Sequence, residues 1–178
     1  LAIEHPVLVE GLILLDGALL QAEPMFDCNL RLMQVPLLGE WLYTRLRNNP
    51  DAAYESLRNV YHDLDGMPER DRDFLYQRVN KRVWSDGQRR AYLSTLRSLP
   101  DWVRRSQEGL IDQLTELNIP TLVIRGEFDP LFPEENADKL VESGANTAKV
   151  IIHQAGHMPH QEAPQAVIKT IQVWVEEL

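Results

Sequence analysis

The sequence has little cysteine, no long apolar run and no excess of basic residues. These three shortages argue against a disulfide, a membrane span and a nucleic-acid partner. The single cysteine, Cys28, excludes a disulfide within the chain; this fits a reducing compartment, and we expect a cytoplasmic protein. No apolar stretch approaches the roughly 18–20 residues that cross a bilayer, so we expect no membrane span. The net charge of −9 leaves no surplus of cations to neutralise phosphates, which argues against a nucleic-acid partner.

The residues that are present have the composition of an ordinary folded domain. The 178 residues are 44% hydrophobic and 25% charged, which is enough apolar surface for a core and argues against disorder. Near the start, the mostly apolar stretch from Val9 to Leu15 ends at Asp16 and Gly17. A short run of this kind predicts a strand that is buried on both faces.

Residues 20–116 have a different pattern, in which apolar side chains recur every three to four positions, as in Leu30, Met33, Leu37 and Trp41. This spacing is typical of helices, and the block has no strand signal. We therefore expect an all-helical insertion, with helices separated by Pro or Gly. The later ones are predicted at 71–84, at 88–99, from Pro100 to Ser106, and at 111–117.

The last third of the chain alternates between strands and helices. Strands are predicted at 121–125 and 148–153, and helices at 133–143 and 164–177. This order indicates an α/β fold with a parallel sheet and right-handed crossovers. In such sheets, reactive side chains lie just past the carboxyl ends of the strands.

Asp129 and His157 each follow one of these two strands. Taken singly, Asp129 before a proline is typical of an Asx turn, and His157 could be a packed loop residue. Taken together, they lie at the ends of neighbouring strands about 5 Å apart, within reach of one another. A carboxylate that holds a histidine in one tautomer and stabilises its imidazolium is an acid–base pair. Of the other candidates, Asp16 reads as a turn former and His160 as a loop or helix-start residue.

The chain resembles the α/β-hydrolase family, and the resemblance is carried by two stretches, Ile119–Pro133 and Ile152–Pro164. The first contains Gly126-Glu-Phe-Asp-Pro130, whose aspartate corresponds to the family's triad acid. The second contains Gly156-His157, whose histidine corresponds to the general base. The resemblance implies that residues 1–19 are the strand after the nucleophile helix, that 20–116 are the helical cap, and that 117–178 are the C-terminal core.

Two family features are missing from the sequence. It contains no Gly-x-Ser-x-Gly elbow, which carries the family's nucleophile, and no His-Gly oxyanion loop. We therefore expect the chain to be the C-terminal portion of the fold, with the nucleophile on a preceding segment. The chain alone would then be inactive, and the strand near Leu12 would have an unpaired edge, which is an association liability.

The resemblance implies a hydrolase of small, partly apolar, ester-like substrates, with an upstream serine, Asp129 and His157 as the triad and with no cofactor or metal. One alternative is an epoxide hydrolase or haloalkane dehalogenase, in which the upstream nucleophile is an aspartate. Carbon–carbon bond hydrolases, again with serine, are a further option. A third reading is an inactive hydrolase-like module that serves in binding or interaction.

Overall fold

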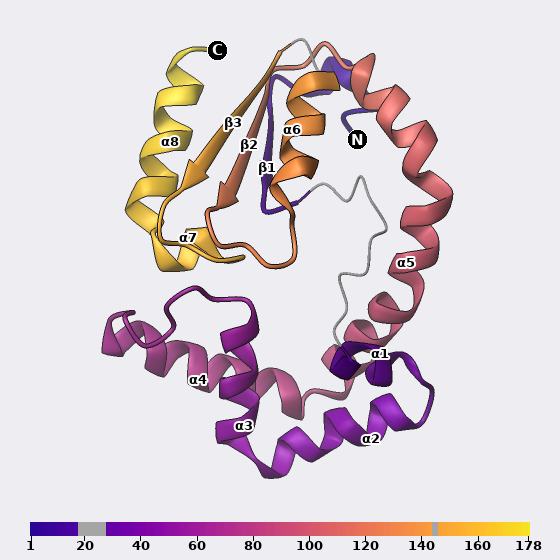
Figure 1. Cartoon of the computed structure of the whole chain (residues 1–178), viewed down its shortest axis with the longest axis vertical. Coiled ribbons are helices and arrows are strands. Elements are labelled where there is room, and N and C mark those ends of the chain that lie inside the picture. The colour runs from indigo at the N-terminus through magenta and orange to yellow at the C-terminus, as the bar shows by residue number, and fades with distance from the viewer. Residues whose placement is uncertain (18–27, 144–145) are drawn as a thin grey trace. The chain divides into compact units, whose positions relative to one another are not determined.

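The computed structural model describes residues 1–17, 28–143 and 146–178. The chain forms two compact units (Figure 1). The first, which we call the sheet unit, comprises residues 1–21, 60–63 and 106–178. The second, the helical unit, comprises residues 22–59 and 64–105.

The sheet unit is built on three parallel strands, β1 (Leu12–Leu15), β2 (Thr121–Gly126) and β3 (Thr147–Ile152), in the order β1-β2-β3. In the register, Leu15 lies opposite Ile124. The short helices η1 (Pro6–Leu8) and α7 (Pro159–Glu162) and the longer α6 (Glu134–Ser143) and α8 (Pro164–Glu176) complete the unit. The predicted α/β class with a parallel sheet is thus confirmed.

The central strand β2 is apolar on both faces because helices cover both. Val123 packs with Phe132, Ala137 and Leu140, which come from α6 and the loop before it. Leu122 and Ile124 point the other way and pack with Ile152, Ala155 and Val167, the last of which lies on α8. Figure 1 shows α6 and α8 on opposite sides of the sheet. Strand β2 is therefore held rigidly at the point where its carboxyl end opens into the Asp129 loop.

Strand β1 differs from the prediction of a strand buried on both faces. It is shorter than the apolar run suggested, and its residues are half-buried or exposed, with Ile13 37% exposed. Within the described residues β1 pairs only with β2, so one of its edges has no neighbouring strand. The apolar composition alone did not distinguish such an edge strand from a central one.

The helical unit contains the short helices α1 (Cys28–Gln34), α2 (Leu38–Arg45), η2 (Leu46–Asn48), α3 (Pro50–Glu55) and η3 (Ser56–Asn59), followed by α4 (Glu69–Trp84). Its core gathers Tyr43, Ala53, Val79 and Val83. The N-terminus of α3 is capped by Asn49, whose side-chain oxygen accepts the Ala52 N–H at 3.1 Å. No strand occurs among the described residues 28–105.

The prediction of separate helices after residue 88 is wrong. One helix, α5 (Asp86–Thr115), runs through Pro100, and from residue 106 onward it belongs to the sheet unit. A proline inside a helix removes one backbone donor and disfavours the preceding turn, but packing can outweigh that cost. Within the described part of the chain, none of the helices is both long and apolar enough to span a membrane.

Candidate functional site

The two candidate residues predicted from the sequence meet at the carboxyl edge of the sheet. Asp129 lies in the loop after β2 and His157 in the loop after β3. Because the strands are parallel neighbours, both loops emerge at the same edge. Nδ1 of His157 lies 3.0 Å from Oδ1 and 2.9 Å from Oδ2 of Asp129. The Asp129 side chain is fully buried and the His157 side chain is 22% exposed. Solvent therefore reaches the pair through the imidazole and not through the carboxylate.

The Asp129 carboxylate also organises its own loop. Its Oδ1 accepts the backbone N–H of Leu131 at 2.8 Å and of Phe132 at 3.0 Å. The Asx-turn interpretation and the acid–base interpretation are therefore compatible, since one carboxylate makes both sets of contacts. These bonds leave the carboxylate little freedom to rotate away from the imidazole.

Arg125 is a buried residue of the site that sequence reasoning missed. Only 6% of it is exposed, and its guanidinium donates to three backbone carbonyls of the acid loop. Nε donates to Phe132 O at 2.8 Å, Nη1 to Glu127 O at 3.1 Å and Nη2 to Asp129 O at 3.2 Å. The guanidinium thus acts as an internal template that fixes the loop around Asp129. An arginine at the end of an apolar strand was the one signal that could have suggested this role.

The imidazole of His157 favours its protonated form more than a free histidine does. Burial lowers the pKa of His157, but the hydrogen bond that its Nδ1–H donates to Asp129 and the negative charges of Asp129 and Asp16 outweigh burial, and the pKa is raised. With Nδ1 bonded to Asp129, Nε2 is the nitrogen left to exchange a proton with another group. Such an arrangement can act as a general base.

Asp16 contributes a second carboxyl group to the same edge. It follows β1 with a positive φ of 48°, as expected of a turn former, and its Oδ1 accepts the Gly126 N–H at 3.2 Å. Its Oδ2 is buried and has no hydrogen-bond partner in the described part of the structure. Burial raises the pKa of Asp16 to about 7; the Gly126 hydrogen bond lowers it and the Asp129 charge raises it further. Asp16 is therefore an uncharged or half-charged neighbour of the pair near neutral pH.

The backbones of the two loops touch at glycines. A Cβ on Gly126 would lie 2.6 Å from the carbonyl oxygen of Ala155, so no larger residue fits there without moving the histidine loop. This close approach brings the end of β2 directly against the turn that precedes His157.

A family model for the α/β hydrolase fold matches residues 1–164. The chain belongs to the α/β-hydrolase family. A search of curated proteins gave no match. Several solved structures of hydrolases share the fold.

A thermophilic esterase from Thermogutta terrifontis is 22% identical, with a TM-score of 0.67, and the match covers 99% of this chain and 59% of that one. A 2-hydroxy-6-oxo-6-phenylhexa-2,4-dienoate hydrolase from a Rhodococcus strain is 14% identical (TM-score 0.66; 98% and 58% covered). A serine hydrolase involved in carbazole degradation is 17% identical (TM-score 0.65; 99% and 58% covered). The present hydrolase chain therefore spans less than two thirds of these structures.

Other possible sites in this α/β-hydrolase chain are weaker. His160, on α7, has its pKa lowered by burial and by the neighbouring His157, and its Nε2 lies 3.1 Å from the side-chain nitrogen of Gln161. Within residues 1–17, 28–143 and 146–178, no group of three or more His, Cys, Asp or Glu side chains could hold a metal ion.

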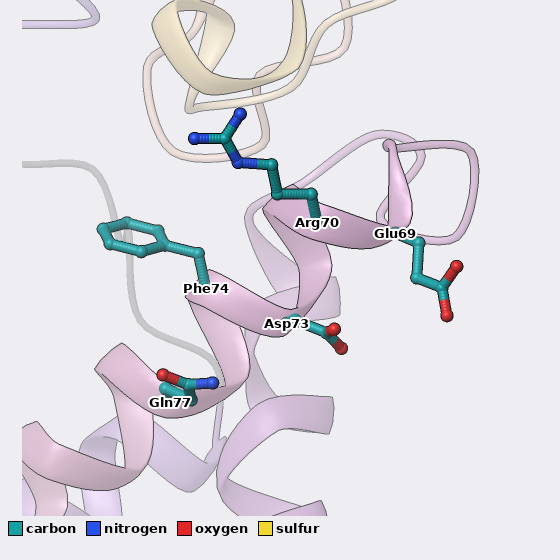
Figure 2. Close-up of a pocket in the computed structure, with 5 residues that line it drawn as sticks. All are labelled: Glu69, Arg70, Asp73, Phe74 and Gln77. Carbon is teal, nitrogen blue, oxygen red and sulfur yellow. The ribbon is translucent and has the colours of Figure 1, made fainter.

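An open hollow of about 520 Å³ lies along α4 of the helical unit. Figure 2 shows the side chains that line it. Its lining residues all come from the first turns of that one helix: Glu69, Arg70, Asp73, Phe74 and Gln77. The hollow shares no residue with the Asp129–His157 pair, and a single helix face provides neither enclosure nor converging polar groups. It is a surface depression and not a substrate cavity.

Proposed function

We propose that this chain supplies the acid and the base of an ester hydrolase whose serine nucleophile lies on a segment preceding Leu1. The observation that carries the proposal is the contact of His157 Nδ1 with both carboxylate oxygens of Asp129, at 3.0 and 2.9 Å. Further support comes from the similar structures, which include an esterase and a serine hydrolase. In the family's chain order, the nucleophile comes before the acid and the histidine.

The proposed reaction has two halves. In the first, the serine Oγ attacks the ester carbonyl carbon while Nε2 of His157 takes the hydroxyl proton. The histidine then gives that proton to the leaving alcohol as the C–O bond breaks, which leaves an acyl-enzyme. In the second half, His157 takes a proton from water, the resulting hydroxide opens the acyl-enzyme, and the proton returns to the serine. Asp129 keeps the ring in the tautomer that both halves need and stabilises the imidazolium.

The proposed substrate is small and partly apolar. The support is the aromatic content of the helical unit, where several large rings are half exposed and are not used in that unit's core. Examples are Trp41, Trp84 and Trp102, at 54%, 62% and 50% exposed. Pockets for small apolar ligands are lined mainly by hydrophobic and aromatic side chains.

The test is the hydrolysis of p-nitrophenyl butyrate by the complete protein that contains this chain. His157→Ala should lower kcat by about 10³-fold or more, the size of effect that removal of a triad member produces. The matched control is Glu176→Gln, which removes the charge of an exposed side chain at the end of α8 and should leave kcat close to that of the wild type. Near-wild-type turnover by His157→Ala would overturn the proposal.

Mass spectrometry of peptides from the acid-quenched protein identifies the residue that carries the covalent intermediate, and so identifies the nucleophile. The proposal expects the acyl group on a serine-containing peptide. An alkyl ester on an aspartate peptide would instead identify an epoxide hydrolase or haloalkane dehalogenase. A complete protein with neither adduct nor turnover would be a hydrolase-like binding module. The present chain assayed alone should give no turnover.

A further inference from the structure

A short stretch of backbone, Val60–Asp63, lies against both loops of the acid–base pair. We call it the strap. In sequence it is flanked on both sides by residues of the helical unit, yet it belongs to the sheet unit. The backbone N–H of His157 itself donates to the carbonyl of Val60 at 2.7 Å. On the acid loop, the ring of His62 stacks on Phe128, the residue before Asp129, with centroids 4.0 Å apart and planes 13° apart.

The carboxylate of Glu162 joins the strap to the histidine loop. Its Oε1 accepts the N–H of His62 at 2.7 Å and of Asp63 at 3.1 Å. Its Oε2 accepts the N–H of Gly156 at 2.7 Å, immediately before His157. A carboxylate that accepts several backbone N–H groups forms strong, charge-assisted bonds. The neighbouring residue Gln161 also holds the strap, because its side-chain oxygen accepts a hydrogen bond from the Tyr61 hydroxyl at 2.6 Å.

The contact between strap and loop is close enough to depend on a glycine. A Cβ on Gly156 would lie 2.6 Å from His62 N and 2.7 Å from Val60 O. Gly156 does not have a positive φ, so an alanine there would act by displacing the strap and not by straining its own backbone.

We propose that Glu162 is a positioning residue that, through the strap, fixes the backbone of the His157 loop and so holds the imidazole against Asp129. In the described part of the structure, no hydrogen bond or ion pair joins Glu162 to the imidazole or to the Asp129 carboxylate. It bonds the backbone of Gly156 directly and reaches the backbone of His157 through the strap. The consequence for turnover rests on the proposed function, but the positioning itself does not, because it concerns the geometry of the pair in this chain.

The test follows the titration of the His157 imidazole by nitrogen NMR in the complete protein that contains this chain. Glu162→Ala and Gly156→Ala should each lower the pKa of His157 by roughly 0.5 or more, toward its value in Asp129→Asn, because a loosened ring loses its bond to the carboxylate. Gly156→Ala changes no charge, so agreement between the two variants reports geometry. Glu162→Gln should give a smaller effect, since the amide oxygen still serves His62 and Asp63 while its NH₂ opposes the Gly156 N–H.

The matched control is again Glu176→Gln. The Glu176 side chain is exposed at the end of α8, in the same unit as Glu162. This variant should leave the pKa of His157 unchanged. If His157 titrates as in the wild type in both Glu162→Ala and Gly156→Ala, with the fold retained by circular dichroism, the positioning role is overturned.

Amide hydrogen exchange in the unmodified chain gives a second measurement that needs no variant. The amides of His62, Asp63, Gly156 and His157 should exchange with one common opening free energy, because one set of contacts protects all four. Exchange of the two strap amides far faster than those of Gly156 and His157 would overturn the proposal. A complete protein that shows the coupled behaviour but hydrolyses no ester would keep this inference and overturn the proposed function.

Discussion

At the scale of the residue, the site contains two carboxyl groups, Asp129 and Asp16, that differ in how many hydrogen-bond donors surround them. Asp129 is ringed by donors: two backbone N–H groups and the imidazole of His157. Asp16 has one donor, Gly126, and a buried oxygen with no partner within the described residues. The first environment holds the Asp129 carboxylate in a fixed orientation, and the second disfavours a charge on Asp16.

Asp16→Asn should stabilise the chain at alkaline pH. Because the pKa of Asp16 is raised from 3.8 to about 7, mainly by burial, the folded state keeps a proton that the unfolded state releases. This contribution to the free energy of unfolding is complete below pH 3.8 and is lost as the pH rises to about 7. Asparagine keeps the Gly126 contact without a buried charge. Thermal unfolding should therefore show Tm raised by a few degrees at pH 8 and almost unchanged at pH 4.

His157 contributes in the same direction, since its pKa is also raised: its stabilisation is present at low pH and is lost as the pH rises through its pKa in the folded state. Some pH dependence should therefore remain in Asp16→Asn. A Tm at pH 8 below that of the wild type would show that the Asp16 carboxylate is a favourable charge, contrary to this account.

Arg125→Met should destabilise the fold by about 3 kcal/mol, because three backbone carbonyls of the acid loop, two of them in buried bonds, lose a charged donor. Urea unfolding measures this, and the loss should be accompanied by exchange broadening in NMR signals of the loop from Glu127 to Phe132. Arg104→Met makes the same chemical change at a side chain that is 70% exposed, where we expect a change within about 0.5 kcal/mol. Equal effects of the two substitutions would mean that the buried guanidinium does not template the acid loop.

At the scale of the element, the open edge of β1 has a testable consequence. The N–H groups of Leu12 and Asp16 point to β2, where they donate to Pro120 and Ile124. In a strand, alternate residues face the same neighbour, so the N–H of Ile13 points to the other edge. Such an edge can pair with a second chain.

The present chain should therefore associate as its concentration rises, and Ile13→Pro should suppress the association by removing an edge donor. Sedimentation velocity over a range of concentrations measures it. Ile13→Ala keeps the N–H and removes most of the 37% exposed side chain, and it should associate as the wild type does. If alanine is as effective as proline, the association is a side-chain contact, and if the wild type stays monomeric throughout, the edge is not a pairing site.

The sequence predicted the elements whose signal is local. Strands β2 and β3 are β-branched runs next to glycine or histidine-containing turns, and their parallel order placed Asp129 and His157 at one edge. Pro100 misled the helix prediction, because the residues on both sides of it support one long helix more strongly than a proline opposes it. The local sequence of β1 does not predict its edge position, because that position depends on which strands flank it. The open edge near Leu12 was expected only from the family resemblance.

Glu162 and the strap could not have been predicted, because the contact joins residues 100 positions apart. Nothing about Val60-Tyr-His-Asp63 as a sequence distinguishes it from a linker between helices. Arg125 was overlooked for a related reason: its three acceptors are backbone carbonyls, which carry no sequence signature.

At the scale of the whole molecule, the site is assembled from widely separated parts of the chain. Asp16, the strap and residues 125–162 all belong to the sheet unit, although the strap lies within the segment 20–116 that the resemblance assigns to a cap. The division into residues 1–19, 20–116 and 117–178 stays a prediction. The chain covers 59%, 58% and 58% of the three hydrolase structures described above, so the proposed reaction is assigned to the complete protein and not to this chain alone.

The central claim is that Asp129 acts only through His157, and a double-mutant cycle on the complete protein tests it most directly. We would measure kcat for p-nitrophenyl butyrate in Asp129→Asn, His157→Ala and the double variant. Residues of one catalytic unit are strongly non-additive, so the double variant should be about as active as His157→Ala alone. If the two losses instead multiply, Asp129 and His157 act independently, and the acid–base pair is not the catalytic unit.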